Sequence, residues 1–178
     1  MWYSNSRFIF WWRIWLPSVA TTLEYDGSSW TAGGSLNTAA SYQAAGTQTA
    51  TLGSESNSTS ANGTESYNGT SWTAVADRNT ARAQIAGFGS QTSAIVAGGY
   101  NVGPGTPQLT NAEQWNGSSW VTTASLGAAI RNSMGVGTQG SSDSGLITGG
   151  NNPSPYSNAT EEFTGETTAL NTKTLTSS

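Results

Sequence analysis

The sequence predicts an all-β fold, a β-propeller or part of one, with about three to four four-stranded blades. Three observations predict it: a unit that repeats every 42 to 48 residues, a composition rich in turn-forming residues, and short apolar runs that end in paired glycines. The chain of 178 residues suffices for one domain or for three or four repeats. Ser, Thr, Gly and Asn make up about half of it, yet aromatic residues at 10% and a net charge of -4 argue against disorder.

Each repeat contains an aromatic residue, a turn centred on glycine and a second aromatic residue. Asx-Gly pairs favour a type I′ turn between two strands, with both turn residues at positive φ. The flanking aromatic rings are then large side chains for burial. Hairpins are therefore expected near residues 24–30, 65–72, 113–120 and 161–165, marked in turn by Tyr25, Gly27 and Trp30, by Tyr67, Gly69 and Trp72, by Trp115, Gly117 and Trp120, and by a degraded copy with Phe163 and Gly165.

Two further strands per repeat are expected on the inner side of each hairpin. An arginine, Arg82 or Arg131, is followed by a Gly-Ser/Thr-Gln motif and then by a short apolar run that ends in two glycines, Gly98-Gly99 or Gly149-Gly150. These runs are too short for a buried helix and are typical of inner strands. Four strands in each unit of this length are typical of a propeller blade.

The order of these features resembles the kelch repeat of kelch and galactose-oxidase-like β-propellers. The resemblance extends over residues 21–165 and includes the apolar run ending in Gly-Gly, the aromatic turn-Trp hairpin and the arginine. The first repeat departs from it, with Ser54-Glu55-Ser56 in place of Gly-Gly and Ala39-Ala40 in place of Arg. The short polar repeats are also similar to kelch-type arrays of bacteriophage and marine-viral structural proteins.

The composition leaves few residues for catalysis. The chain has no His and no Cys, which excludes Ser-His-Asp and Cys-His nucleophiles, Cys/His zinc sites and disulfides. It equally excludes the copper chemistry of galactose oxidase, whose ligands are His and Tyr beside a Cys-Tyr crosslink. Six Lys and Arg residues are too few for a nucleic-acid surface. We therefore expect no catalytic, cofactor-binding or metal-binding residues, no cofactor and no enzymatic activity.

Four glutamates recur just before the hairpins: Glu24, Glu65, Glu113 and Glu161. A retaining glycosidase needs two carboxyl groups about 5 Å apart, whereas one carboxylate per blade is spread around a ring. We expect these residues to pair between blades with Arg82 and Arg131 in a structural role.

The loops between the repeats, residues 100–109 and 151–158, differ in length and are the expected binding surface. Tyr100 and Tyr156 lie in these loops and are candidates for stacking on sugars. The predicted function is a non-enzymatic binding and structural module outside cells or on a virion, such as a viral tail-fibre or adhesin component that recognises surface glycan or protein. The alternative is an accessory propeller of a secreted carbohydrate-active enzyme whose catalytic part is missing.

An open array of three repeats and a partial fourth leaves two apolar faces in water. Either copies of the chain assemble to close a ring, or the chain is a fragment of a larger ring. Residues 167–178 have the spacing of a finishing strand that could pair with the opposite end of the chain in such a ring.

Residues 1–20 match no other part of the chain and form a separate aromatic segment. Its apolar stretch is too short for a membrane span. Three interpretations are open: a signal-like peptide, an authentic aromatic N-terminus, or a frame-shifted translation of a preceding blade. The third arises because Trp has a single codon, so that Trp11-Trp12-Arg13 becomes Gly-Gly when translated one base later.

Sequencing the gene tests the frame-shift hypothesis. Codons 2–12 translated in the +1 frame are expected to spell a Gly-Thr-Gln motif followed, nine residues after its glycine, by Gly-Gly, the spacing of Gly89 and Gly98. Codons that do not yield this repeat would exclude the hypothesis.

Overall fold

The expected all-β class is confirmed by the computed structural model of the chain. The structure describes residues 18–56, 62–101, 105, 107–137, 141–151 and 158–164, and the backbone of 173–175. These residues contain strands, turns and bends and no helix. The aromatic segment up to residue 17, Tyr156 and Gly165 lie outside the described residues.

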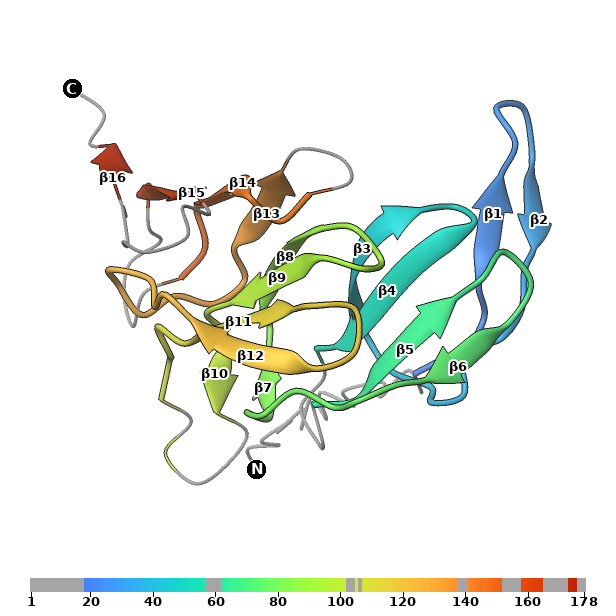
Figure 1. Cartoon of the computed structure of the whole chain (residues 1–178), viewed down its shortest axis with the longest axis horizontal. Coiled ribbons are helices and arrows are strands. Elements are labelled where there is room, and N and C mark those ends of the chain that lie inside the picture. Colours follow the sequence, from blue (N-terminus) through green and yellow to red (C-terminus); the bar gives the residue numbers. More distant parts are fainter. Residues whose placement is uncertain are drawn as a thin grey trace, which may run out of the picture.

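Three four-stranded antiparallel sheets follow one another along the chain (Figure 1). In each sheet the strands neighbour one another in chain order, so one repeat unit makes one sheet. Sheet I contains β3 (Tyr42–Thr47), β4 (Ala50–Glu55), β5 (Thr64–Tyr67) and β6 (Trp72–Ala74); sheet II contains β8 (Ala86–Gly89), β9 (Ala94–Ala97), β11 (Ala112–Trp115) and β12 (Trp120–Thr123); sheet III contains β13 (Met134–Gly137), β14 (Ser144–Thr148), β15 (Thr160–Thr164) and β16 (Lys173–Leu175).

Two smaller sheets complete the described part of the chain. The N-terminal hairpin, β1 (Leu23–Tyr25) and β2 (Trp30–Ala32), precedes sheet I and has the register of the outer strand pairs β5–β6 and β11–β12. In the second small sheet, β7 (Arg82–Ala83), which lies between sheets I and II in the chain, pairs with β10 (Tyr100–Asn101), which lies between β9 and β11. The N-terminal hairpin therefore matches the outer half of a sheet.

The first strands of the three sheets lie side by side. Strand β8 of sheet II contacts both β3 of sheet I and β13 of sheet III. The three sheets therefore pack against one another in chain order, with their first strands innermost.

The predicted type I′ turns are wrong. Tyr25 pairs directly with Trp30, so the loop has four residues instead of two. Asp26 keeps an ordinary φ because its carboxylate accepts the N–H groups of Ser28 and Ser29 at 2.8 Å, and only Gly27 takes a positive φ of 101°. These hydrogen bonds hold the pKa of Asp26 far below its usual value. Asn68 and Asn116 form the same Asx turns before Gly69 and Gly117.

The hairpin expected near residues 161–165 has its first strand there: Thr160–Thr164 form β15, whose antiparallel partner is β16 at Lys173–Leu175. The chain reverses between these two strands, over a longer separation than the four residues of the other hairpins, and Gly165 lies outside the described residues. The finishing strand expected in the tail is thus the outer strand of sheet III, paired locally with β15.

The paired glycines lie where the chain leaves the second strand of a sheet. Gly98 and Gly99 have φ values of 66° and 92°, and a Cβ atom on Gly99 would lie 2.5 Å from the Ala83 carbonyl oxygen. The Gly99 N–H donates to the Ile130 carbonyl at 2.7 Å, which ties sheet II to the chain that enters sheet III. Only glycine provides both this conformation and this close approach.

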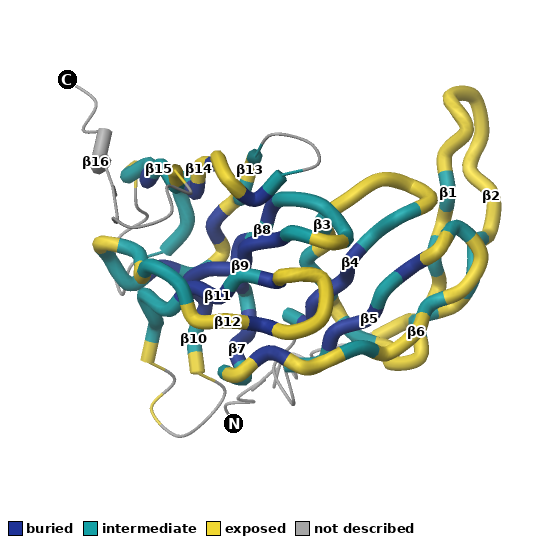
Figure 2. The backbone as a smooth tube through the Cα atoms, in the orientation of Figure 1, coloured by how far each residue is buried: buried dark blue, intermediate teal, exposed yellow. Residues whose placement is uncertain are grey.

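Two apolar cores lie between successive sheets. Leu52 and Ala45 of sheet I pack on Val96, Trp115 and Trp120 of sheet II. The second core joins sheets II and III, with Phe88 and Ile95 against Ile147 and Phe163. Each sheet is therefore buried by its neighbours in the chain, and the burial is deepest in β9 and β11 of sheet II (Figure 2).

Hydrogen bonds between side chains join the same pairs of sheets. The Trp72 indole donates to Thr22 beside the N-terminal hairpin at 2.8 Å, and the Trp120 indole donates to Thr64 of sheet I at 3.0 Å. Gln91 of the Gly-Ser-Gln motif reaches back to the Tyr67 carbonyl at 2.5 Å. The repeated Trp and Gln residues therefore connect each unit to the one before it.

Glutamates hold the connections that enter each sheet. Glu113 accepts the N–H groups of Asn79 and Thr80 at 2.7 and 3.3 Å and pairs with the Arg82 guanidinium at 2.8 Å. Glu161 likewise accepts the N–H groups of Gly127 and Ala128. Since these N–H groups lie in the loops between sheets, each carboxylate fixes the path from one sheet into the next.

The expected pairing of four glutamates with two arginines is correct only for Glu113 and Arg82, the one ion pair among the described residues. Glu24 is out of register with the other three, because Leu23 occupies the equivalent position, and its carboxylate accepts the Tyr67 hydroxyl. Arg131 places its guanidinium over the Tyr100 ring, 5.3 Å from the centroid. Glu161 accepts the N–H groups of Gly127 and Ala128, and Arg131 contacts the ring instead.

Arg78 adds a second buried cation beside this pair. Its guanidinium donates to the carbonyls of Glu55 and Arg82 at 2.6 and 3.2 Å. Burial, and then the neighbouring Arg82, lower the pKa of Arg78 to about 9, so it stays charged at pH 7.

Replacing Glu113 by Gln leaves the Arg82 guanidinium buried without its counter-charge, since both side chains are at most 2% exposed. We expect the free energy of unfolding to fall by about 3 kcal/mol, measured by urea denaturation. Asp143→Asn at an exposed position is the matched control and should stay within about 0.5 kcal/mol of wild type. An E113Q variant as stable as that control would contradict the stabilising role of the Glu113–Arg82 pair.

Acid is expected to weaken the connection into sheet I. Burial acts to raise the pKa of Glu65, but hydrogen bonds from Asn37, Tyr42 and Thr38 outweigh it and hold the pKa below 4.5. A carboxyl with a lowered folded-state pKa contributes stability above pH 4.5 that is lost as the pH falls through its folded-state pKa. Glu65→Gln should therefore be less stable than wild type at pH 7, and the difference should shrink on acidification in pH-dependent denaturation. A difference that stays constant with pH would exclude this role.

Candidate functional site

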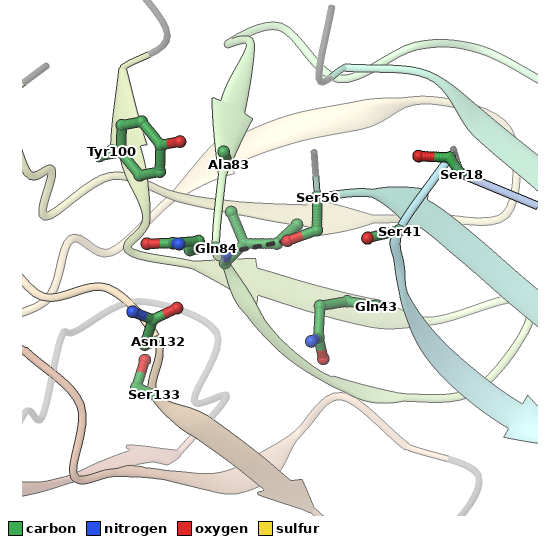
Figure 3. A pocket seen from close by; sticks show the side chains of 10 residues that line it. Ser18, Ser41, Gln43, Ser56, Ala83, Gln84, Tyr100, Asn132 and Ser133 are labelled. Atoms are coloured by element: carbon green, nitrogen blue, oxygen red, sulfur yellow. Dashed lines mark hydrogen bonds between the residues drawn. The ribbon is translucent and has the colours of Figure 1, made fainter. Parts of the chain in front are cut away.

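A polar hollow of about 660 Å³ lies where the chain enters the three sheets (Figure 3). It is formed by the segments just before the first strands and just after β4, and the half-buried Tyr100 of β10 forms part of its wall. The lining residues are Ser18, Ser41, Gln43, Ser56, Ala83, Gln84, Ile85, Tyr100, Asn132 and Ser133.

Backbone hydrogen bonds across the three sheets position this lining. The Gln84 N–H donates to the Ser56 carbonyl at 3.2 Å, and the Asn132 N–H donates to the Gln84 carbonyl at 3.0 Å. The Ile85 N–H adds a bond to the Ser56 hydroxyl at 3.2 Å, drawn as a dashed line in Figure 3. These bonds fix the end of β4 and the segments that lead into sheets II and III relative to one another.

Two lining residues hold an unfavourable backbone conformation. Gln84 and Asn132, with φ values of 55° and 54°, are the only non-glycine residues at positive φ among those the structure describes. They lie at equivalent places, each two residues before the first strand of its sheet. Such a conformation costs a non-glycine residue about 1–2 kcal/mol. Backbone hydrogen bonds to the neighbouring sheets hold both residues in this conformation.

The hollow also contains unsatisfied polar atoms. Within the described chain, Gln84 Oε1 and Ser133 Oγ are buried and accept or donate no hydrogen bond. A buried polar atom without a partner costs free energy, and a bound ligand or water would remove that cost. Both atoms belong to lining residues but lie beneath the surface of the hollow.

Tyr100 is the aromatic residue of the site. Its backbone pairs with Ala83, and the Arg131 guanidinium covers one face of its ring. This arrangement gives Arg131, expected in a carboxylate pair, the role of fixing the Tyr100 ring. Tyr156, the second stacking candidate, lies outside the described residues.

None of the repeat residues named from the sequence is among the residues that line the hollow. The aromatic pairs Tyr25 and Trp30, Tyr67 and Trp72, and Trp115 and Trp120 face each other across their hairpins, with ring centroids 5.0, 4.9 and 5.5 Å apart. Gly149 and Gly150 follow β14 at positive φ, as Gly98 and Gly99 follow β9. These residues build the sheets and do not line the hollow.

No charged side chain is among the ten lining residues. The glutamates Glu65, Glu113 and Glu161 are buried elsewhere and accept the backbone N–H groups described above. In the part of the chain that the structure describes, no three acidic residues are grouped closely enough to hold a metal ion. The chemistry available in the hollow is neutral: amides, hydroxyls and one phenol.

Sequence reasoning found Tyr100 but missed Gln84, Asn132, Gln43 and Ser133. Their side chains are common polar types with no motif of their own. Gln84 and Asn132 lie at the same distance before the first strands of successive sheets, but this equivalence becomes visible only when the strand positions are known.

Among solved structures, the chain is similar to that of YjhT, with a TM-score of 0.69 and 16% identity over 86% of this chain. The chain has the same fold as YjhT. At this identity the likeness shows the fold alone, and the match covers 52% of the YjhT chain, so this chain spans about half its length. No family model and no curated protein matches the sequence.

The described residues contain no long apolar helix that could span a membrane.

Gln84→Gly tests whether the positive φ at the hollow is a cost to the fold. Glycine adopts this conformation without strain, so the variant should be more stable by up to about 1 kcal/mol in urea denaturation. Gln43→Gly, in strand β3 at the other side of the hollow, should lose a similar amount because strand glycines are unfavourable. A Gln84→Gly variant that is destabilised as much as Gln43→Gly would show that the Gln84 conformation carries no strain.

Proposed function

We propose that the chain is part of a kelch-like β-propeller and acts as a non-enzymatic binding and structural module that recognises surface glycans. The setting we propose is extracellular or virion-associated, as in a viral tail-fibre or adhesin component. Support for the propeller comes from three successive four-stranded sheets with adjoining innermost strands. The order of repeat motifs and the fold shared with YjhT agree with it.

The polar hollow is the observation that carries the binding role. Its volume of about 660 Å³ falls in the range of small-molecule sites. Amide and hydroxyl groups both donate and accept hydrogen bonds, as the hydroxyl groups of a neutral sugar require. Tyr100 supplies an aromatic surface on which a sugar ring stacks. A charged ligand would find no counter-charge in the lining, which favours a neutral glycan over a phosphorylated or acidic one.

The positions of the carboxylates support a binding role over a hydrolytic one. Glycoside hydrolysis uses two carboxyl groups on either side of the scissile bond. The hollow contains none, and Glu113 and Glu161 are bound to backbone N–H groups outside it. A glycan held in this hollow therefore meets hydrogen-bonding groups and an aromatic ring.

Glycan-array screening followed by titration calorimetry tests this function. Tyr100→Ala should weaken binding of the selected neutral glycan by about tenfold or more, since ring stacking contributes about 1.4 kcal/mol. Tyr100→Phe should keep most of the affinity. Val121→Ala, at an exposed position of β12 outside the hollow, is the control and should bind as wild type.

Three results would overturn the proposal. Absence of binding to any neutral glycan excludes the ligand class, and equal affinities of the Tyr100→Ala and Val121→Ala variants exclude the site. Turnover of the bound glycan would instead favour the carbohydrate-active enzyme.

A further inference from the structure

Every sheet has two faces that the register of the repeats distinguishes. Phe88 and Ile95 are paired neighbours on β8 and β9, and the equivalent pairs are Ala45 with Leu52 in sheet I and Val136 with Leu146 in sheet III. We call the face with these residues the forward face. The opposite face, which we call the rear face, carries Val96, Trp115 and Trp120 in sheet II and Ile147 and Phe163 in sheet III.

Within the chain, the forward face of each sheet packs on the rear face of the next. Leu52 and Ala45 meet the rear face of sheet II in one core, and Phe88 and Ile95 meet the rear face of sheet III in the other. The forward residues Leu52, Phe88 and Ile95 are 2%, 4% and 1% exposed as a result.

Sheet III has no successor among the described residues, and its forward face is open. Val136 and Leu146, equivalent to the buried Phe88 and Ile95, are 52% and 38% exposed, and the neighbouring Met134 is 65% exposed. A shallow groove of about 470 Å³ runs over this face beside Val136 and Leu146, and Glu162, the register partner of Leu146, also lines it. An apolar face of this kind marks an interaction site.

The N-terminal hairpin presents the complementary, rear face. Tyr25 and Trp30 hold the register positions of Trp115 and Trp120, which are 3% and 5% exposed in sheet II. In the hairpin, Tyr25 is 47% and Trp30 is 66% exposed, and Leu23 on the same face is 57% exposed. The hairpin and sheet III lie at opposite ends of the molecule, so these two faces cannot meet within one chain (Figures 1 and 2).

We propose that two copies of this chain associate head to tail, with the forward face of sheet III of each copy on the rear face of the N-terminal hairpin of the other. Two such joints, related by twofold symmetry, close one ring. The joint repeats the packing that already joins sheets I, II and III, so it needs no new kind of contact. The occupant is a second copy because one chain carries both complementary faces and covers 52% of the YjhT chain, so that two copies supply about the length of that fold.

Sedimentation equilibrium and light scattering of the full chain test this proposal. Wild-type protein should form a discrete dimer of about twice 18.4 kDa at micromolar concentration, without larger species, because the twofold ring leaves no free face. Val136→Glu on the forward face and Trp30→Glu on the rear face should each raise the dimer dissociation constant by about 100-fold or more, since each buries an unpaired carboxylate at both joints.

Val121→Glu on β12 is the matched control, because Val121 is 51% exposed and lies on neither terminal face. It should dimerise as wild type. Circular dichroism and unfolding midpoints, measured at a concentration low enough that wild type and all three variants are monomeric, should be unchanged and would show that folding is unaffected, as expected for exposed positions.

Mixing the Val136→Glu and Trp30→Glu variants separates head-to-tail association from other modes. One intact forward face then meets one intact rear face, so a heterodimer should form although neither variant dimerises alone. A monomeric wild-type protein overturns the proposal, as does a dimer that Trp30→Glu leaves intact or a mixture that stays monomeric. If the forward face of sheet III associates with itself, or if another part of the chain covers that face, one of these three results is expected.

Discussion

The packing of each sheet's forward face on the next sheet's rear face is the interaction on which the rest of the structure depends. A small four-stranded sheet buries too little by itself to be stable, so its faces must be covered by neighbours. Here Leu52 enters a core with Trp115 and Trp120, and Phe88 enters one with Ile147 and Phe163. The short polar strands are ordered because these cores hold them together.

Buried polar groups fix the geometry that the apolar cores alone would leave free. The Glu113 carboxylate binds the N–H groups of Asn79 and Thr80 while also pairing with Arg82, so the connection between sheets I and II has one path. The same arrangement brings Gln84 and Asn132 to equivalent places at the hollow, each at positive φ. Rigid connections between sheets thus hold Gln84 and Asn132 in their strained backbone conformation at the hollow.

The sequence predicts the sheets well and the site poorly, for a physical reason. Trp72 and Trp120 recur because sheets I and II each use an indole hydrogen bond to the preceding unit, and such a repeated requirement is visible as a period. The Asx turns were misassigned because Asn-Gly serves two loop lengths, and the choice depends on whether the side chain binds the next N–H groups. Gln84 and Ser133 belong to no period of residue types, and only the meeting of three sheets brings them together.

The central claim, that the sheets pack in chain order face to face, is tested most directly by nuclear Overhauser contacts in solution. A Cβ built on Gly145 would lie 2.4 Å from the Phe88 ring, so the two residues touch across sheets II and III. We expect contacts between the Phe88 ring protons and the α protons of Gly145 and Gly137, and between the Trp120 indole proton and Thr64. Contacts confined to strands of the same sheet, with none from Phe88 to Gly145, would contradict the account.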